Sequence, residues 1–167
     1  YGWMRDGSGG ISATASSSII YDSTAPSISS FTINTGDLTT TNTVVNLTIS
    51  ASDSLSGITA YYASETSSTP SSTSSGWTSI TSSTSYSATV SFTLSSASSV
   101  GNHSRTVYVW FKDTAGNVSD SASDGITLVV SDTTVPSSPT ININTGDSNT
   151  SNTVVSLALS ATDNVGI

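Results

Sequence analysis

The chain has 167 residues, with three lysine and arginine residues against eleven aspartate and glutamate residues and a formal net charge of −8. Three basic side chains cannot neutralise a phosphate backbone, so the composition argues against nucleic-acid binding. The chain has no cysteine, which excludes disulfides and thiolate metal sites. No apolar run reaches the roughly 18 residues of a membrane span.

The first residues of the chain resemble a segment that occurs later in the sequence. WMRDGSGGISA at residues 3–13 is a near copy of WFKDTAGNVSD at residues 110–120, with a spacing of 107 between matching tryptophans (110 − 3). A repeat longer than a single strand pair indicates a modular protein. Residues 1–22 are therefore predicted to be the C-terminal part, the last two strands, of a preceding repeat.

Residues 23–132 are predicted to form one complete repeat. Its apolar residues alternate with polar ones, which is the pattern of half-buried β-strands rather than of helices. Strands are expected at 27–34, 43–51, 57–63, 77–81, 86–94, 105–112 and 117–130, the last interrupted by SDSASDG. Seven short strands in about 110 residues are typical of an Ig-like antiparallel β-sandwich. The expected core residues are Val45, Leu47, Ile49, Val90, Phe92, Val107, Val109 and Phe111.

Residues 133–167 begin a third copy. The segment DSTAPSISSFTINTGDLTTTNTVVNLTISASD at 22–53 returns as DTTVPSSPTININTGDSNTSNTVVSLALSATD at 132–163, shifted by 110 positions (132 − 22). This last segment is predicted to form the first two strands of a following repeat. A period of domain length predicts all-β repeats in tandem, arranged as beads on a string rather than as a solenoid.

Three motifs carry a family resemblance: D-T-A-G-N-V-S after an alternating strand, the D-S/T-T-A/V-P start and the A-x-D loop. Together they resemble bacterial Ig-like repeats, which are related in shape to fibronectin type III modules. The resemblance implies a structural repeat of a long extracellular stalk, adhesin or cell-surface filament. Its implied partners are neighbouring repeats and other copies of the chain. Two alternatives stay open: a carbohydrate-binding module and a spacer in a secreted enzyme.

Catalytic groups are scarce. His103 is the sole histidine and Glu65 the sole glutamate, and the sequence contains no nucleophile elbow, phosphate-binding glycine loop or HExxH motif. General acid–base or nucleophilic catalysis needs several such groups close together. The chain is therefore predicted not to be an enzyme.

Aspartates are predicted to gather at the repeat junctions. Alternating strand direction brings Asp22, Asp53 and Asp113 to one end of the repeat, and Asp132 and Asp163 start the next junction in the same way. Carboxylates and loop carbonyls are the ligands that Ca²⁺ prefers, and the family resemblance also implies calcium at junctions. The alternative is that these aspartates only form turns.

Aromatic residues form a second candidate site. If Val107, Val109 and Phe111 face the core, Tyr108 and Trp110 face outward, with Tyr61 beside them on the neighbouring strand. Tyr1 and Trp3 occupy the equivalent positions one repeat earlier. Packing across the strands of the sheet is the favoured interpretation of such a patch. Binding of a surface glycan or of another chain is the alternative.

Overall fold

The computed structural model describes residues 1–165, and its regular elements are β-strands apart from two short 3-10 turns, so the predicted all-β class is confirmed. Among these residues no helix is long and apolar enough to cross a membrane. The strands are β1 (Ser27–Ile33), β2 (Thr39–Thr40), β3 (Val44–Ser52), β4 (Ile58–Ser64), β5 (Thr78–Ser83), β6 (Ser85–Thr93), β7 (Gly101–Asp113), β8 (Ala122–Val130), β9 (Ser137–Ile143) and β10 (Leu157–Thr162). The short turns η1 (Asn34–Gly36) and η2 (Asn144–Gly146) follow β1 and β9.

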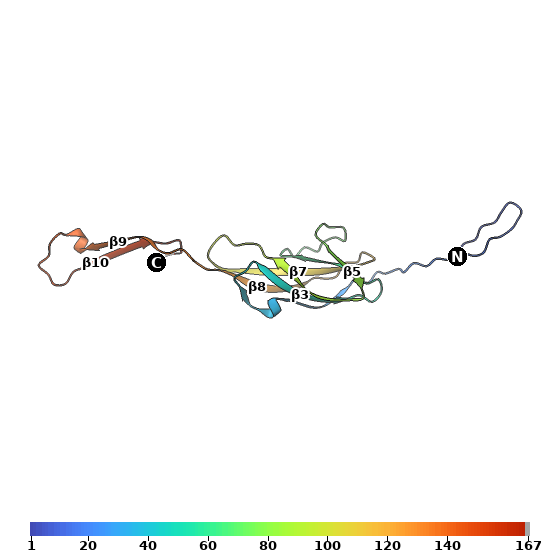
Figure 1. The fold of residues 1–167 in the computed structure, drawn as a ribbon, viewed down its shortest axis with the longest axis horizontal. Coiled ribbons are helices and arrows are strands. Elements are labelled where there is room, and N and C mark those ends of the chain that lie inside the picture. The colour runs from blue at the N-terminus through green and yellow to red at the C-terminus, as the bar shows by residue number, and fades with distance from the viewer. Residues whose placement is uncertain (166–167) are drawn as a thin grey trace.

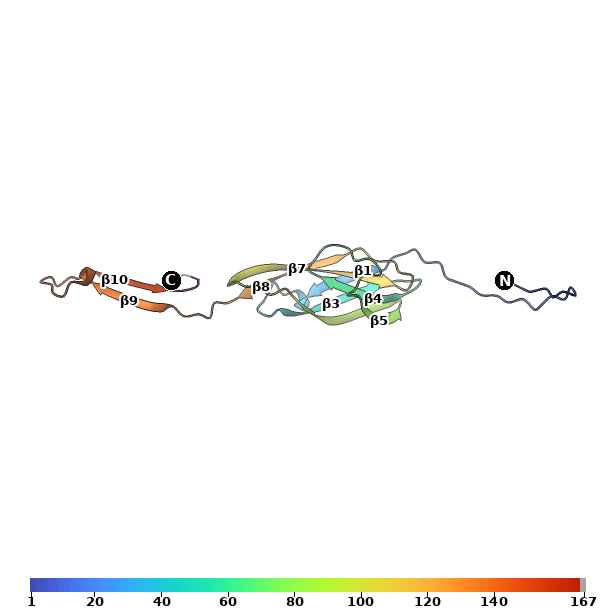
Figure 2. The same cartoon turned by 90° about the horizontal axis from the view of Figure 1, so that it is seen from above.

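Eight of these strands form a central unit with an extended segment at each end (Figures 1 and 2). One sheet has the order β1-β3-β6, and the other has the order β2-β8-β7-β4-β5. The N-terminal residues form a loop that runs out from one pole. The β9–β10 hairpin extends from the opposite pole (Figure 1).

The hydrophobic core lies between the two sheets of the central unit. Val45, Leu47 and Ile49 of β3 face Val107, Val109 and Phe111 of β7, and the exposed fraction of each is 2% or less. These six predicted core positions are confirmed. The predicted positions Val90 and Phe92 on β6 are partly buried and pack against the same core. The alternation of the sequence therefore identifies the inner face of both sheets.

The strand bounds differ from the predictions mainly in the second half of the unit. β7 begins at Gly101, earlier than the predicted start at residue 105, because its first residues pair with the end of β8. β8 begins at Ala122 and includes the second part of the segment expected to interrupt it, whereas residues 119–121 lie before the strand. The pairing of β2 with β8 is parallel and spans only two residues, too few for a pattern to reveal.

The turn η1 carries the chain from one sheet to the other. Asn34, Thr35 and Gly36 all have positive φ angles, of 46°, 60° and 98°. This left-handed backbone costs a β-branched residue roughly 1–2 kcal/mol. The Asn34 side chain offsets part of that cost, since its Oδ1 accepts a hydrogen bond of 2.9 Å from the Asn46 amide. The turn thus moves the chain from β1 to β2 through a strained position at Thr35.

We expect Thr35→Gly to stabilise the central unit by about 0.5–1 kcal/mol, because glycine adopts a φ of 60° without a steric penalty. The hydrogen bond from Thr35 Oγ1 to the Asn34 carbonyl would be lost, which limits the gain. Urea denaturation measures the change. The matched control is Thr39→Gly in β2, where the backbone is extended and the same substitution should destabilise. Equal effects of both substitutions would contradict the assignment of strain to Thr35.

Local geometry recurs along the chain at the spacing of the sequence repeat. Ile33 pairs with Leu47 in the β1–β3 ladder, and Ile143 pairs with Leu157 in the β9–β10 ladder, 110 residues later. The φ angles of η2 are 47°, 59° and 97°, within 1° of those of η1. At the other end, the Asp6 amide donates to the Gly10 carbonyl as the Asp113 amide donates to Asn117. Equal sequence segments therefore fold into equal local structures.

Candidate metal site

Three aspartate side chains converge at the pole where the N-terminal segment enters the central unit. Asp22 precedes β1, Asp53 follows β3 and Asp113 ends β7, and one carboxylate oxygen from each lies within 4.8 Å of the others. The exposed fractions of the three residues are 9%, 4% and 2%. The convergence predicted from strand direction is therefore confirmed, and the three groups are buried.

Asp53 and Asp113 are held in place by the turns that they begin. Asp53 Oδ1 accepts backbone amides from residues 55, 56 and 57, the shortest being 2.7 Å from Gly57. Asp113 Oδ1 accepts the amides of Gly116 and Asn117 at 2.7 and 2.8 Å. Gly116 has a φ of 95°, as expected for the left-handed position of this turn. In each turn, the hydrogen bonds hold one oxygen of the carboxylate. They thereby also set the direction in which the other oxygen points.

Asp22 comes from the segment that precedes β1, here called the linker, and it accepts fewer backbone hydrogen bonds than Asp53 and Asp113. Its Oδ1 accepts the Thr24 amide at 2.9 Å, whereas its Oδ2 is buried without a hydrogen-bond partner among residues 1–165. Ser56 Oγ lies beside it and is also buried without a partner of good geometry. The Ser56 hydroxyl and the Thr24 amide lower the pKa of Asp22, so this carboxylate is charged at neutral pH. Asp22 Oδ2 is thus buried and charged, and within residues 1–165 it has the Ser56 hydroxyl beside it but no hydrogen bond of good geometry, which points to a missing ligand.

Asn117 ties the linker to the turn. Its Nδ2 donates to Asp113 Oδ2 at 2.8 Å and lies 3.3 Å from the backbone carbonyl of Asp22. The Asn117 side-chain amide is uncharged, so it does not neutralise the carboxylates. Its two contacts set the distance between the linker and the β7–β8 turn. No lysine or arginine forms an ion pair with the three carboxylates in the described structure, so their mutual repulsion is not relieved by the chain.

The spacing of the three oxygens is compatible with a single bound Ca²⁺ ion. Two oxygens bound to one ion lie at most twice the metal–oxygen distance apart, which is about 5 Å for Ca²⁺. The three carboxylate oxygens lie within 4.8 Å of one another, inside that limit. The donor set of three carboxylates with nearby carbonyls is also typical of a calcium site.

The second junction contains only part of this arrangement. Asp132 Oδ1 accepts the Thr134 amide at 2.9 Å, as Asp22 does with Thr24, and Asp163 Oδ2 is buried without a described partner. The Thr134 amide, together with the Asn164 and Asp163 side chains, lowers the pKa of Asp132. Within residues 1–165 no third acidic side chain joins this pair.

Trp110 lies on the outward face of the five-stranded sheet, as predicted, but its exposed fraction is 0%. The centroid of its ring lies 6.0 Å from that of Tyr62, with the two rings edge to face, and 6.1 Å from the centroid of the Tyr108 ring. Tyr62 in turn packs against Trp77, whose Nε1 donates to the Ser71 carbonyl at 2.9 Å. The serine-rich loop before β5 therefore folds back onto this face. The predicted patch at Trp110 is consequently packed and is not available to a ligand.

The predicted outward position of Tyr61 is wrong. Tyr61 packs against Phe111 and Tyr86 on the core side, and Tyr62 occupies the outward position beside Trp110. The cause is a β-bulge at Thr59, where the pairing of β4 with β7 shifts between Ile58 and Ala60. One extra residue reverses the face of every later side chain in the strand. Tyr1 and Trp3 lie in the N-terminal loop with exposed fractions of 95% and 62%.

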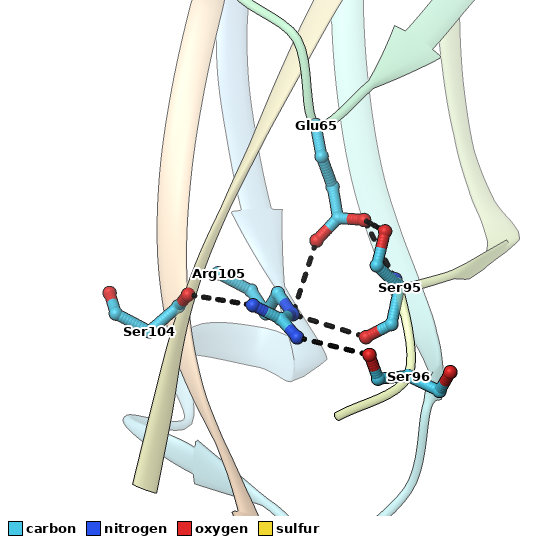
Figure 3. Close-up of polar contacts among 5 residues, drawn as sticks. All are labelled: Glu65, Ser95, Ser96, Ser104 and Arg105. Atoms are coloured by element: carbon cyan, nitrogen blue, oxygen red, sulfur yellow. Dashed lines mark hydrogen bonds and ion pairs between the residues drawn. The ribbon is translucent and has the colours of Figure 1, made fainter. Parts of the chain in front are cut away.

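A polar cluster at the opposite end of β7 organises another loop (Figure 3). Glu65 and Arg105 point toward one another, with 3.5 Å between Glu65 Oε1 and Arg105 Nε. Arg105 also donates to the carbonyls of Ser95, Ser96 and Ser104. An open cavity of about 420 Å³ lies beside them and includes Tyr108. Because both charged groups are satisfied by the chain, the cluster fixes the loop after β6 rather than offering free binding groups.

Comparison with protein-family models, with curated proteins and with solved structures finds no match for this chain. Interpretation of the site therefore depends on its own geometry.

Proposed function

We propose that the chain is a structural segment of a long extracellular stalk, adhesin or surface filament, and that Ca²⁺ braces its repeat junctions. In this proposal the two-sheet central unit is one Ig-like sandwich of a tandem array. Its partners are the neighbouring repeats. The observation that carries the proposal is the buried Asp22 Oδ2, a charged oxygen that forms no hydrogen bond of good geometry within residues 1–165 and that the linker contributes to a carboxylate cluster of the folded unit.

The mechanical role follows from where the ligands come from. Asp53 and Asp113 belong to the folded unit, whereas Asp22 lies on the segment that connects it to the preceding residues. An ion bound to all three carboxylates joins the linker to the unit and restricts the angle between them. An array braced in this way behaves as a rod, which suits a protein that spaces or displays other parts at a distance from a cell.

The experiment compares the chain in Ca²⁺ and in chelator, by thermal melting and by small-angle X-ray scattering. Extracellular calcium modules bind at about 10⁻⁴–10⁻³ M. At a tenfold excess over the dissociation constant, binding stabilises the folded state by about 1.4 kcal/mol. We expect a higher melting temperature and a larger maximum dimension with Ca²⁺, and smaller changes with Mg²⁺.

Matched substitutions identify the site. Asp22→Asn removes one ligand charge and should abolish most of the calcium effect, whereas Asp37→Asn removes the same charge from an exposed position and should leave it unchanged. Identical melting temperatures and dimensions in Ca²⁺ and in chelator would overturn the proposed calcium site. The aspartates would then act only as turn residues.

A further inference from the structure

β6 is a free edge of the three-stranded sheet. It pairs with β3 along its whole length, from Val44↔Thr93 to Ser52↔Ser85, without a register shift. In the described structure no strand pairs with its other side. The edge is therefore as long and as regular as the strand itself.

The backbone groups that face outward from this edge can be assigned. The Leu94 amide donates to the Thr43 carbonyl at 2.8 Å, so even-numbered residues of β6 direct their backbone groups toward β3. Odd-numbered residues then direct theirs away from the sheet. The amides of Ser87, Thr89, Ser91 and Thr93 have no hydrogen-bond acceptor described within residues 1–165.

The other edges of the two sheets are protected, and this one is not. β2 is only two residues long, and the β4–β5 pairing contains a register shift. At the β1 edge, Asp124 Oδ2 accepts the Ile33 amide at 2.8 Å. Short strands, bulges and inward charges are the usual devices that prevent edge-to-edge pairing. β6 has none of them, and its sequence SYSATVSFT contains no charged residue and no proline.

We propose that β6 pairs edge to edge with β6 of a second copy of this chain, antiparallel and centred on Thr89. This register places Thr89 opposite Thr89, Ser87 opposite Ser91, and Ser85 opposite Thr93. The outward amides and carbonyls of Ser87, Thr89 and Ser91 then satisfy one another across a two-fold axis, as an isologous interface requires. The Ser85 amide and carbonyl already bond to Ser83 Oγ, so the paired segment is centred on residues 87–91. The result is a continuous sheet of the order β1-β3-β6-β6-β3-β1.

Charge and side-chain chemistry select a second copy as the partner. The chain carries a net charge of −8, so most approaches between copies are repulsive. The strands β1, β3 and β6 contain no charged residue, so copies that meet at this edge bring no charges face to face. Hydroxyls already pair across the sheet, with 2.8 Å between Ser50 Oγ and Ser87 Oγ. The same hydroxyl row continues across the proposed interface.

The proposal goes beyond the calcium-braced junction and does not depend on it. Junction bracing acts along one chain, whereas β6 pairing joins different chains side by side. Calcium removal should therefore leave the β6 interface intact, and the failure of one proposal can be distinguished from the failure of the other.

Cysteine cross-linking tests the register directly, because the chain has no cysteine of its own. Residues opposite each other in a hydrogen-bonded antiparallel pair have Cα atoms about 5.5 Å apart, which a disulfide can span. Thr89→Cys should form a disulfide-linked dimer under mild oxidation. Ser91→Cys alone should not, because in this register the two copies of residue 91 lie about 13 Å apart along the strands. A mixture of Ser87→Cys and Ser91→Cys chains should cross-link.

Sedimentation measures the association without cross-links. Thr89→Lys places like charges opposite each other and should weaken dimerisation by about tenfold or more. The matched control is Thr48→Lys on β3, which adds the same charge beside Thr89 but away from the edge and should have little effect. The proposal is overturned by a monomer at all concentrations or by equal cross-linking at Thr48→Cys and Thr89→Cys. It is also overturned by association that Thr89→Lys does not weaken, a result that would indicate contact through the exposed β9–β10 hairpin.

Discussion

Trp110→Ala is expected to destabilise the central unit by about 3–5 kcal/mol, although Trp110 lies outside the core between the sheets. Its exposed fraction is 0%, and its ring packs against Tyr62 and Tyr108. Removing it leaves a cavity and takes away a packing partner of Tyr62, which in turn holds Trp77 after the serine-rich loop. Urea denaturation followed by circular dichroism measures the loss as a lower midpoint at an unchanged slope.

Two other substitutions separate the contributions to this effect. Trp110→Phe keeps an aromatic ring and removes Nε1, which is buried without a described partner, so it should cost only about 1–2 kcal/mol. Trp77→Ala should cost less than Trp110→Ala because Trp77 is only half-buried, even though it loses the contact with Lys112, whose Nζ lies 4.8 Å from its ring centroid. A Trp110→Ala variant within 1 kcal/mol of the wild type would show that the ring is a surface group and reopen its role in ligand binding.

The core between the two sheets could be predicted because it depends on alternation alone. Val45, Leu47 and Ile49 identify the inner face of β3 directly, and the same holds for the apolar residues of β7. Strand direction, which follows from the number of strands, was also sufficient to bring Asp22, Asp53 and Asp113 to one pole. These features require only the period of the sequence and the order of the strands.

The outer face of the five-stranded sheet could not be predicted in the same way. The bulge at Thr59 depends on the Thr59 hydroxyl, which donates to the Asp113 carbonyl at 2.9 Å, and no sequence period reports such a contact. The loop before β5 approaches this face at Gly76, where a Cβ atom would lie 2.9 Å from the ring of Tyr62, the residue that packs against Trp110. This glycine belongs to a serine-rich loop whose composition suggests flexibility. Long-range packing of low-complexity sequence thus determines whether an outward aromatic residue is exposed.

Asp113→Ala is expected to cost about 2–3 kcal/mol in the absence of calcium, because it removes the acceptor for two backbone amides and for the Asn117 side chain. Asp113→Asn should behave differently. An amide oxygen can still accept the two backbone amides of the turn, although the hydrogen bond from Asn117 Nδ2 is lost because the new amide nitrogen cannot accept it. The loss of one negative charge relieves the repulsion with Asp22 and Asp53 and offsets that cost. The stability of Asp113→Asn in chelator should therefore lie within about 1 kcal/mol of the wild type.

Adding calcium should separate both variants from the wild type in their stability. Both lack the third carboxylate, so neither should gain the stabilisation of about 1.4 kcal/mol expected for the wild type at a tenfold excess of ligand. The order of stabilities in chelator separates the structural role of Asp113 from its role as a ligand. If Asp113 only forms its turn, Asp113→Asn should respond to calcium as the wild type does. If it also binds the ion, the wild type becomes more stable than Asp113→Asn only when calcium is present, and urea denaturation in both buffers distinguishes these outcomes.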